Sequence, residues 1–274
     1  MNYLKLIIEA EDINVNDILV AELAKYEFNG FMEEENNLVA YISEADCTSE
    51  LEADLLALTS KYHLKIKRST VEDQNWNAQW ESDYEPVLVD DFCAVRATFH
   101  EPIVTVEHEI IVTPKMSFGT GHHATTYMMM KQMQGLNFEG QTVFDYGCGT
   151  GVLAILAQKL GAKESDGIDI DSWAYENTLE NVEINNCADT ITVYCGEIDV
   201  APSKEYDVVL ANINRNVILS TMDKMAARLK KGGHLLTSGF LEADIDLVLE
   251  AAAKHGLKLV HKMEREQWRC LMLA

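Results

Sequence analysis

The chain has 274 residues, of which 47% are apolar, so it can bury one large core or a large and a small one. Its formal net charge of −23 argues against nucleic acid as a direct partner, because binding phosphates requires clustered Lys and Arg. The first twenty residues lack a basic start followed by an apolar core, and no eighteen uncharged apolar residues run together. We therefore expect a soluble, cytoplasmic protein without a membrane segment.

The six cysteines are scattered, without a Cys-x-x-Cys pair or a neighbouring histidine cluster. This pattern is typical of buried thiols in a reducing compartment, so no disulfide and no metal site are expected. Acidic residues are concentrated at the start of the chain, where residues 1–62 hold 14 of them against 3 basic ones. A basic partner is favoured slightly, although acidity as a general surface property fits the composition about as well.

Residues 1–69 are predicted to form a small α+β domain. Their apolar patterns indicate strand, helix, strand, strand, helix and strand, in the segments 3–9, 14–27, 31–32, 38–43, 48–60 and 63–68. This order is typical of a ferredoxin-like domain. Such domains often serve as docking platforms, although a fold by itself proves no function.

Residues 70–85 are interpreted as a linker helix. They are polar except for Trp76 and Trp80, which stand four residues apart and would share one helix face. Packing of the two rings on a neighbouring domain is favoured over stacking on a substrate.

Residues 86–112 are expected to form two or three strands, at 86–89, 92–97 and 108–112, and the segment 113–126 that follows is a candidate ligand loop. It is rich in glycine and threonine and opens a methionine-rich helix at 127–134. Small residues allow a close approach, and threonine hydroxyls at a helix start can bind a ligand. His122 and His123 are adjacent and cannot both face one ion from a regular helix, so loop or capping roles are favoured over a metal site.

From residue 142 onwards, strands and helices alternate. We expect strands at 142–145, 165–169, 191–195, 206–211, 233–238, 257–262 and 267–273, and helices at 151–160, 172–185, 215–229 and 242–254. This pattern predicts an α/β fold with a seven-stranded doubly wound sheet. The last two strands leave no room for a helix between them, so they should form an antiparallel hairpin. Ligands of such sheets bind at the carboxyl ends of the strands.

One such end carries the motif Asp145-Tyr-Gly147-Cys-Gly149-Thr-Gly151. Glycines let the backbone turn sharply and approach a ligand, and the helix that follows presents unpaired N–H groups. A dinucleotide site would need a small residue where Val152 stands. A carboxylate at Asp145 would repel a pyrophosphate but suits a cationic group.

Two further polar residues follow strands. Asp169 ends a strand about 20 residues after the glycines, the spacing at which an acid reaches a ribose diol. A ribose joined to a cationic amino-acid group is S-adenosylmethionine, so Asp145, Gly147, Gly149 and Asp169 are predicted to bind this cofactor. Asn212 follows the strand 206–211. A polar amide at such a position is usually a turn former, but beside the glycine motif Asn212 is a candidate to hold the methyl acceptor.

These motifs together resemble the class I S-adenosylmethionine-dependent methyltransferases, and within them the bacterial PrmA-type ribosomal protein methyltransferases, which modify protein eleven of the large ribosomal subunit. The resemblance covers almost the whole chain. It rests on Glu72-Asp73, Trp76 and Trp80, Phe118-Gly-Thr-Gly121, His123-x-Thr125-Thr126, the glycine motif, Gly167-Ile-Asp169-Ile-Asp171, Ala211-Asn212-Ile213, Ser238-Gly239 and Gln267-Trp268. The chain departs from the family pattern at His122, Ala124 and Ser172.

The resemblance implies that Thr126, Gly147, Asp169 and Asn212 contact the cofactor, that residues 1–69 recognise the substrate, and that residues 86–274 form the S-adenosylmethionine-binding methyltransferase domain. It also implies N-methylation of lysine side chains, an N-terminal α-amine or both, on a basic ribosomal protein. No catalytic side chain is assigned, because the cofactor carries the activated group. We expect a monomer. Methylation of another protein or of a small amine, a non-catalytic binding module and a nicotinamide-dependent oxidoreductase are the alternatives.

Overall fold

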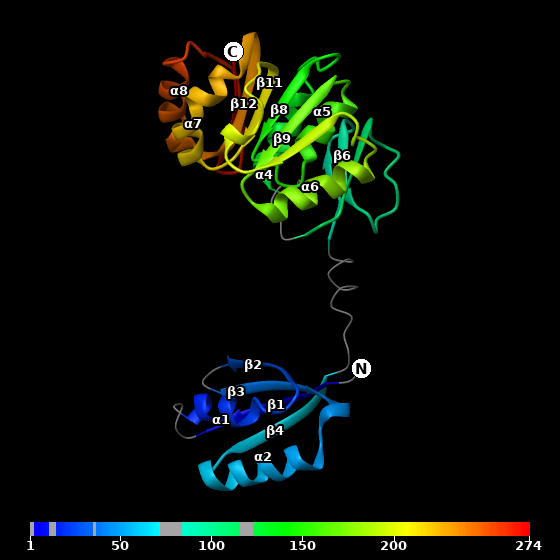
Figure 1. Cartoon of the computed structure of the whole chain (residues 1–274), viewed down its shortest axis with the longest axis vertical. Coiled ribbons are helices and arrows are strands. Elements are labelled where there is room, and N and C mark those ends of the chain that lie inside the picture. The colour runs from blue at the N-terminus through cyan, green and yellow to red at the C-terminus, as the bar shows by residue number, and fades with distance from the viewer. Residues whose placement is uncertain (1–2, 11–14, 35–36, 72–83, 116–122) are drawn as a thin grey trace. The chain divides into compact units, whose positions relative to one another are not determined.

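The computed structural model describes residues 3–10, 15–34, 37–71, 84–115 and 123–274. The chain divides into two compact units, Met1–Tyr84 and Glu85–Ala274 (Figure 1). Each unit has its own hydrophobic core and is described by itself. Trp76, Trp80, His122 and the Phe118–Gly121 motif lie outside the described residues.

The N-terminal unit has the predicted ferredoxin-like order. Its elements are β1 (Tyr3–Glu9), α1 (Val15–Leu23), β2 (Phe28–Glu34), β3 (Asn37–Ser43), α2 (Ser49–Tyr62) and β4 (Lys65–Val71). The sheet has the order β2-β3-β1-β4, and every neighbouring pair is antiparallel. Alternate residues of β1 and β3, such as Leu6, Ile8 and Ile42, pack against Leu19 of α1 and Leu55 of α2. This alternation is the reason why one sheet face is buried under both helices.

The C-terminal unit is built on the predicted seven-stranded sheet. Its strands are β8 (Thr142–Tyr146), β9 (Glu164–Asp169), β10 (Ile191–Cys195), β11 (Tyr206–Asn212), β12 (Leu229–Leu241), β13 (Leu259–Arg265) and β14 (Trp268–Leu273). The order is β10-β9-β8-β11-β12-β14-β13, with the first five strands parallel. The closing pair is antiparallel as predicted, and β14 inserts between β12 and β13.

Helices cover both faces of this sheet (Figure 1). The helices α4 (Ala124–Met133), α5 (Val152–Lys159) and α6 (Ser172–Ile184) share a core with strand residues such as Val208 and Leu210. On the other face, α7 (Arg215–Ala227) and α8 (Ile245–Ala253) pack on residues such as Val209 and Ala211. Strand residues thus alternate between two cores, as a buried parallel strand requires. None of the helices in the described ranges is both long and apolar enough to span a bilayer.

A second, three-stranded sheet precedes α4. It consists of β5 (Val87–Val89), β6 (Cys93–Ala97) and β7 (His108–Val112), in that order, with β6 and β7 parallel. Val95, Ile110 and Val112 join the same core as α5 and α6. The other edge of β7 pairs with no further strand of the described chain.

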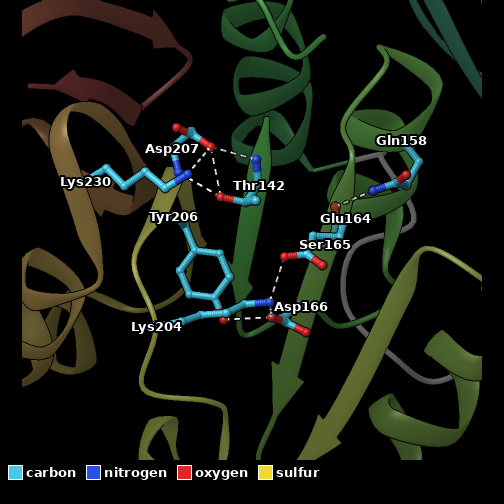
Figure 2. A network of polar contacts seen from close by, with 9 residues as sticks. All are labelled: Thr142, Gln158, Glu164, Ser165, Asp166, Lys204, Tyr206, Asp207 and Lys230. Carbon is cyan, nitrogen blue, oxygen red and sulfur yellow. Dashed lines mark hydrogen bonds and ion pairs between the residues drawn. The ribbon is translucent and has the colours of Figure 1, made fainter. Parts of the chain in front are cut away.

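A polar network lies at the amino ends of β8, β9 and β11 (Figure 2). Asp207 accepts the N–H and hydroxyl of Thr142, at 2.8 and 2.9 Å, and Tyr206 donates its hydroxyl to Asp166 at 2.7 Å. Lys204 pairs with Asp166 at 2.8 Å. Because ligands of α/β sheets bind at the carboxyl ends of the strands, this network holds the edge of the sheet opposite to the expected site.

Candidate cofactor and acceptor site

A cavity of about 810 Å³ opens at the carboxyl ends of β8, β9, β10 and β11. Its lining includes five of the six predicted cofactor-binding residues, namely Thr126, Gly147, Gly149, Asp169 and Asn212. These residues come from α4, the loop after β8, and the ends of β9 and β11. The parallel order of the strands brings their carboxyl ends to one edge, which explains why residues so far apart in sequence share one cavity.

The glycine motif forms the turn between β8 and α5. Gly147, Gly149 and Gly151 have φ angles of 74°, 57° and 77°, a region that favours glycine. The N–H groups of Gly147 and Cys148 both donate to the carbonyl of Ile168, so the turn wraps around the end of β9. A Cβ atom on Gly147 would lie 2.2 Å from Cγ2 of Ile213. The backbone therefore forms one wall of the cavity where a side chain cannot fit.

Asp169 presents a carboxylate that two backbone N–H groups hold in place. Oδ2 accepts the N–H of Gly149 at 2.9 Å, and Oδ1 accepts the N–H of Asp171 at 3.0 Å. Each oxygen keeps a further lone pair, and the residue lines the cavity. A fixed carboxylate with free acceptor capacity is suited to bind the two hydroxyls of a ribose.

Asp145, the sixth predicted residue, is not among those that line the cavity. Its side chain is 1% exposed, and Oδ2 accepts the N–H of Ala154 in α5 at 3.1 Å. Oδ1 has no hydrogen-bond partner among the described residues. Burial, with a smaller contribution from the charge of Asp169, raises the pKa of Asp145 to about 7. The carboxyl of Asp145 therefore contacts the start of α5 and is not part of the cavity lining.

Asn212 is joined to Thr126, 86 residues earlier in the chain. Its Nδ2 donates to Oγ1 of Thr126 at 3.1 Å. Its Oδ1 is buried and has no partner among the described residues. A buried carbonyl oxygen without a partner is costly, so this atom is available to accept a hydrogen bond from a bound molecule.

His123 and Trp268 line the cavity as well. His123 caps α4, where its Nδ1 accepts the N–H of Thr125 at 3.3 Å, so the capping role predicted for this residue is confirmed. Its ring meets that of Trp268 edge to face, with 4.7 Å between the centroids. Within the described ranges, no group of three or more His, Cys, Asp or Glu residues is arranged to hold a metal ion.

The sequence did not point to α6 as a support of the site. Thr178 donates its hydroxyl to the carbonyl of Gly149 at 2.6 Å, and Asn181 donates from Nδ2 to the carbonyl of Thr150 at 2.9 Å. Both side chains are fully buried. Polar residues in a helix are usually taken to face solvent. Only the spacing of four residues between the asparagines in 172–185 could have indicated that they share a buried face.

The chain is similar to known proteins along nearly its whole length. The family model described as "Ribosomal protein L11 methyltransferase (PrmA)" matches residues 5–274. A ribosomal protein L11 methyltransferase of Porphyromonas gingivalis is 40% identical over 262 residues, which are 93% of this chain and 89% of that one. One of Bacteroides fragilis is 38% identical over 258 residues, or 93% and 92% of the two chains.

Among solved structures, the ribosomal protein L11 methylase of Lactobacillus delbrueckii subsp. bulgaricus matches with a TM-score of 0.64 and 24% identity. The match covers 70% of this chain and 98% of that one, and it supports the α/β fold described above. The resemblance inferred from the glycine, Asp169 and Asn212 motifs is confirmed. The chain is an enzyme of the methyltransferase class and belongs to the ribosomal protein L11 methyltransferase (PrmA) family.

Proposed function

We propose that this enzyme transfers methyl groups from S-adenosylmethionine to amino groups of ribosomal protein L11 in the cytoplasm, acting as a monomer. The acceptors are lysine side chains, the N-terminal α-amine or both. The observation that carries the proposal is the amide of Asn212, whose nitrogen is held by Thr126 while its buried oxygen has no described partner. Asn212 lines the cavity, where an attacking amine needs a hydrogen-bond acceptor.

The residues of the cavity fit S-adenosylmethionine. Gly147 packs so closely on Ile213 that the turn beside the cavity has no space for a Cβ, and Asp169 has acceptors for a ribose diol. When bound, the cofactor supplies a methyl group on a positively charged sulfur. The enzyme's own contribution is to orient the two reactants and exclude water.

The amine must lose its proton before it attacks. At pH 7 this costs about 4.6 kcal/mol for a lysine of pKa ~10.4 and about 1 kcal/mol for an α-amine of pKa ~7.8. Nearby carboxylates would raise these pKa values further. An uncharged acceptor such as Oδ1 of Asn212 orients the amine without this penalty. Nδ1 of His123 accepts the backbone N–H of Thr125, so in this structure the ring caps α4.

The N-terminal unit supports the proposal through its charge. Residues 1–62 carry 14 acidic and 3 basic residues, and complementary charge increases the rate at which a basic protein associates. We therefore assign substrate recognition to the ferredoxin-like domain, residues 1–69, and cofactor binding to residues 86–274.

The experiment compares wild type with Asn212→Ala and Asn212→Asp on purified ribosomal protein L11, with methyl groups counted by mass spectrometry. Both variants are expected to lose at least tenfold in kcat, because the amine loses its neutral acceptor or gains a charge that favours its protonated form. S-adenosylhomocysteine affinity, measured by calorimetry, reports the cofactor contribution separately. Unchanged rates in both variants would remove Asn212 from the mechanism.

Two further measurements test the remaining alternatives. Thermal stabilisation by S-adenosylmethionine but not by NAD is expected, since a ligand stabilises the fold that binds it. Stabilisation by NAD but not by S-adenosylmethionine would indicate an oxidoreductase.

The second measurement adds the purified enzyme and radioactive cofactor to an extract of cells that lack this enzyme, and the label should appear on ribosomal protein L11. Labelling of other proteins or small amines alone would contradict the proposed substrate.

A further inference from the structure

Three buried asparagines line one face of α6 and its C-terminal cap. Asn177, Asn181 and Asn185 are spaced by four residues and are 0%, 0% and 7% exposed. Residues at this spacing lie above one another on a helix. A buried amide is costly unless it is hydrogen-bonded, so these side chains require specific partners.

Their partners are the backbone groups of β7 and of Thr113, which follows it. Asn185 accepts the N–H of Ile111 at 3.0 Å and donates to its carbonyl at 2.6 Å. Asn181 accepts the N–H of Thr113 at 2.8 Å, and Asn177 donates to the carbonyl of Thr113 at 3.1 Å. The asparagine amides thus bind the edge of β7 that pairs with no other described strand, in the way a neighbouring strand would.

Asn181 differs from Asn185 in a second bond. While its Oδ1 accepts from Thr113, its Nδ2 donates to the carbonyl of Thr150 in the glycine motif at 2.9 Å. Thr150 is fully buried and follows Gly149, which lines the cavity. Asn185 bonds to Ile111 and to the carbonyl of Asn181 in its own helix, and none of its side-chain bonds within the described ranges reaches the glycine motif.

We propose that Asn181 is a positioning residue for methyl transfer, because its single amide fixes the distance between the glycine motif and Thr113, directly after β7. This inference rests on the proposed function. An amide that is held at both ends has no free rotation to absorb a shift of either segment. Losing it should change the shape of the cofactor cavity, whereas losing Asn185 should weaken only the attachment of β7.

The test compares Asn181→Ala with its matched control Asn185→Ala in the full chain. Both variants should lower Tm, because Asn181→Ala leaves the N–H of Thr113 and the carbonyl of Thr150 unpaired, and Asn185→Ala leaves the N–H and carbonyl of Ile111 unpaired. Asn181→Ala is expected to raise KM for S-adenosylmethionine and Kd for S-adenosylhomocysteine about tenfold, the effect of losing one hydrogen bond. Asn185→Ala is expected to keep both constants within twofold of wild type.

The pH dependence of affinity in Asn181→Asp provides a second readout. A purely structural role would not produce it, and it can be measured even if the alanine variant does not fold. The new carboxyl can still accept the N–H of Thr113. Protonated, it can also donate to the carbonyl of Thr150; ionised, it repels that carbonyl. Affinity of this variant for S-adenosylhomocysteine should therefore fall more than fivefold as pH rises from 5.5 to 8.5, relative to wild type over the same range.

The proposal is overturned if Asn181→Ala keeps wild-type constants, if Asn185→Ala raises them equally, or if the affinity of Asn181→Asp follows the wild-type pH profile. Failure of the proposed function is a separate result. If wild type binds S-adenosylhomocysteine but does not methylate ribosomal protein L11, the substrate assignment is wrong, and the binding comparison still decides the role of Asn181.

Discussion

The carboxylate of Asp169 accepts the backbone N–H of Gly149 at 2.9 Å and thereby joins the carboxyl ends of β9 and β8. The same side chain binds the N–H of Asp171 with its other oxygen. Its orientation is thus set by the protein before any ligand binds. Preorganised groups lose little conformational entropy on binding, so a ribose would meet a carboxylate that already faces it correctly.

Substituting Asp169 by Asn should weaken cofactor binding. An amide has only one acceptor oxygen, and its NH₂ group would face one of the two backbone N–H donors. We expect Kd for S-adenosylhomocysteine to rise about 10- to 100-fold, the range for hydrogen bonds to a charged group. Isothermal titration calorimetry measures this change.

The matched control is Asp171→Asn, which removes the same charge two residues away. Asp171 is exposed and caps α6 by accepting the N–H of Trp173, a bond that an asparagine also makes. Its Kd should stay within threefold of wild type. Equal losses in both variants would mean that net charge, and not the carboxylate of Asp169, governs binding.

The sequence predicted that the glycines form a turn and that Asp169 ends a strand, and the structure confirms both. A glycine turn and an acid at a strand end have positional signatures that survive in a single sequence. The direction of a side chain has no such signature, which is why Asp145 was expected at the ligand and instead faces Ala154. The support from Asn181 was missed for the same reason, since its partners are backbone groups distant in the chain.

Gly147→Ala should cost both stability and cofactor affinity. Its φ of 74° strains any other residue, and the new Cβ would lie 2.2 Å from Cγ2 of Ile213. We expect the free energy of unfolding to fall by about 2–4 kcal/mol, the sum of backbone strain and overpacking. Urea denaturation and calorimetry with S-adenosylhomocysteine measure the two effects.

Gly140→Ala isolates the strain. Gly140 has a similar φ of 70°, but a Cβ there meets nothing within 4 Å. Gly140→Ala should lower the free energy of unfolding by about 1 kcal/mol and leave cofactor affinity unchanged. Adding Ile213→Ala to Gly147→Ala should recover part of the lost stability, because it removes the colliding methyl group. If both glycine variants lose the same stability, the collision contributes nothing.

Burial of Asp145 should make stability depend on pH. Its pKa is raised to about 7, so between pH 4 and 7 the folded state binds a proton that the unfolded state has released. Stability therefore falls as pH rises through this interval and levels off above it. Asp145→Asn removes the titrating group, and its free energy of unfolding should gain up to about 4 kcal/mol relative to wild type between pH 4 and pH 8.

Asp207 is the natural comparison for that titration. Burial would raise its pKa, but hydrogen bonds from Lys230 and Thr142 outweigh burial and hold the pKa below its ordinary value. Asp207→Asn should therefore be destabilised by a constant amount between pH 5 and 8. Urea denaturation at several pH values separates the two variants. A constant difference for Asp145→Asn as well would show that Asp145 stays ionised when buried.

The order of elements followed from apolar periodicity, because periodicity records which side chains are buried. Element ends were less predictable: α4 begins at Ala124 rather than 127, since His123 caps it there. The place of β14 between β12 and β13 was not predicted. Charged residues in β13 and the apolar run at the end of β14 are typical of an edge strand and an inner strand, and they are the signal that could have revealed it.

Neutralising acidic residues of the N-terminal unit should weaken recognition of the protein substrate alone. Glu22, Glu27 and Glu50 are exposed on this unit. The triple change Glu22→Gln, Glu27→Gln and Glu50→Gln should raise KM for ribosomal protein L11 about three- to tenfold at low salt, because each exposed charge contributes a few tenths of a kcal/mol to association. Methylation kinetics at 20 and 300 mM salt measure the change.

A second triple variant, Glu205→Gln, Asp246→Asn and Glu250→Gln, removes three exposed charges from the C-terminal unit and serves as the control. If the N-terminal unit recognises the substrate, this control keeps its KM for ribosomal protein L11, and both triple variants keep the wild-type KM for S-adenosylmethionine. The difference between them should shrink at 300 mM salt, where the Debye length falls below ~8 Å. Equal effects of both variants would show that net charge steers the substrate without a dedicated domain, and the assignment of residues 1–69 would then be wrong.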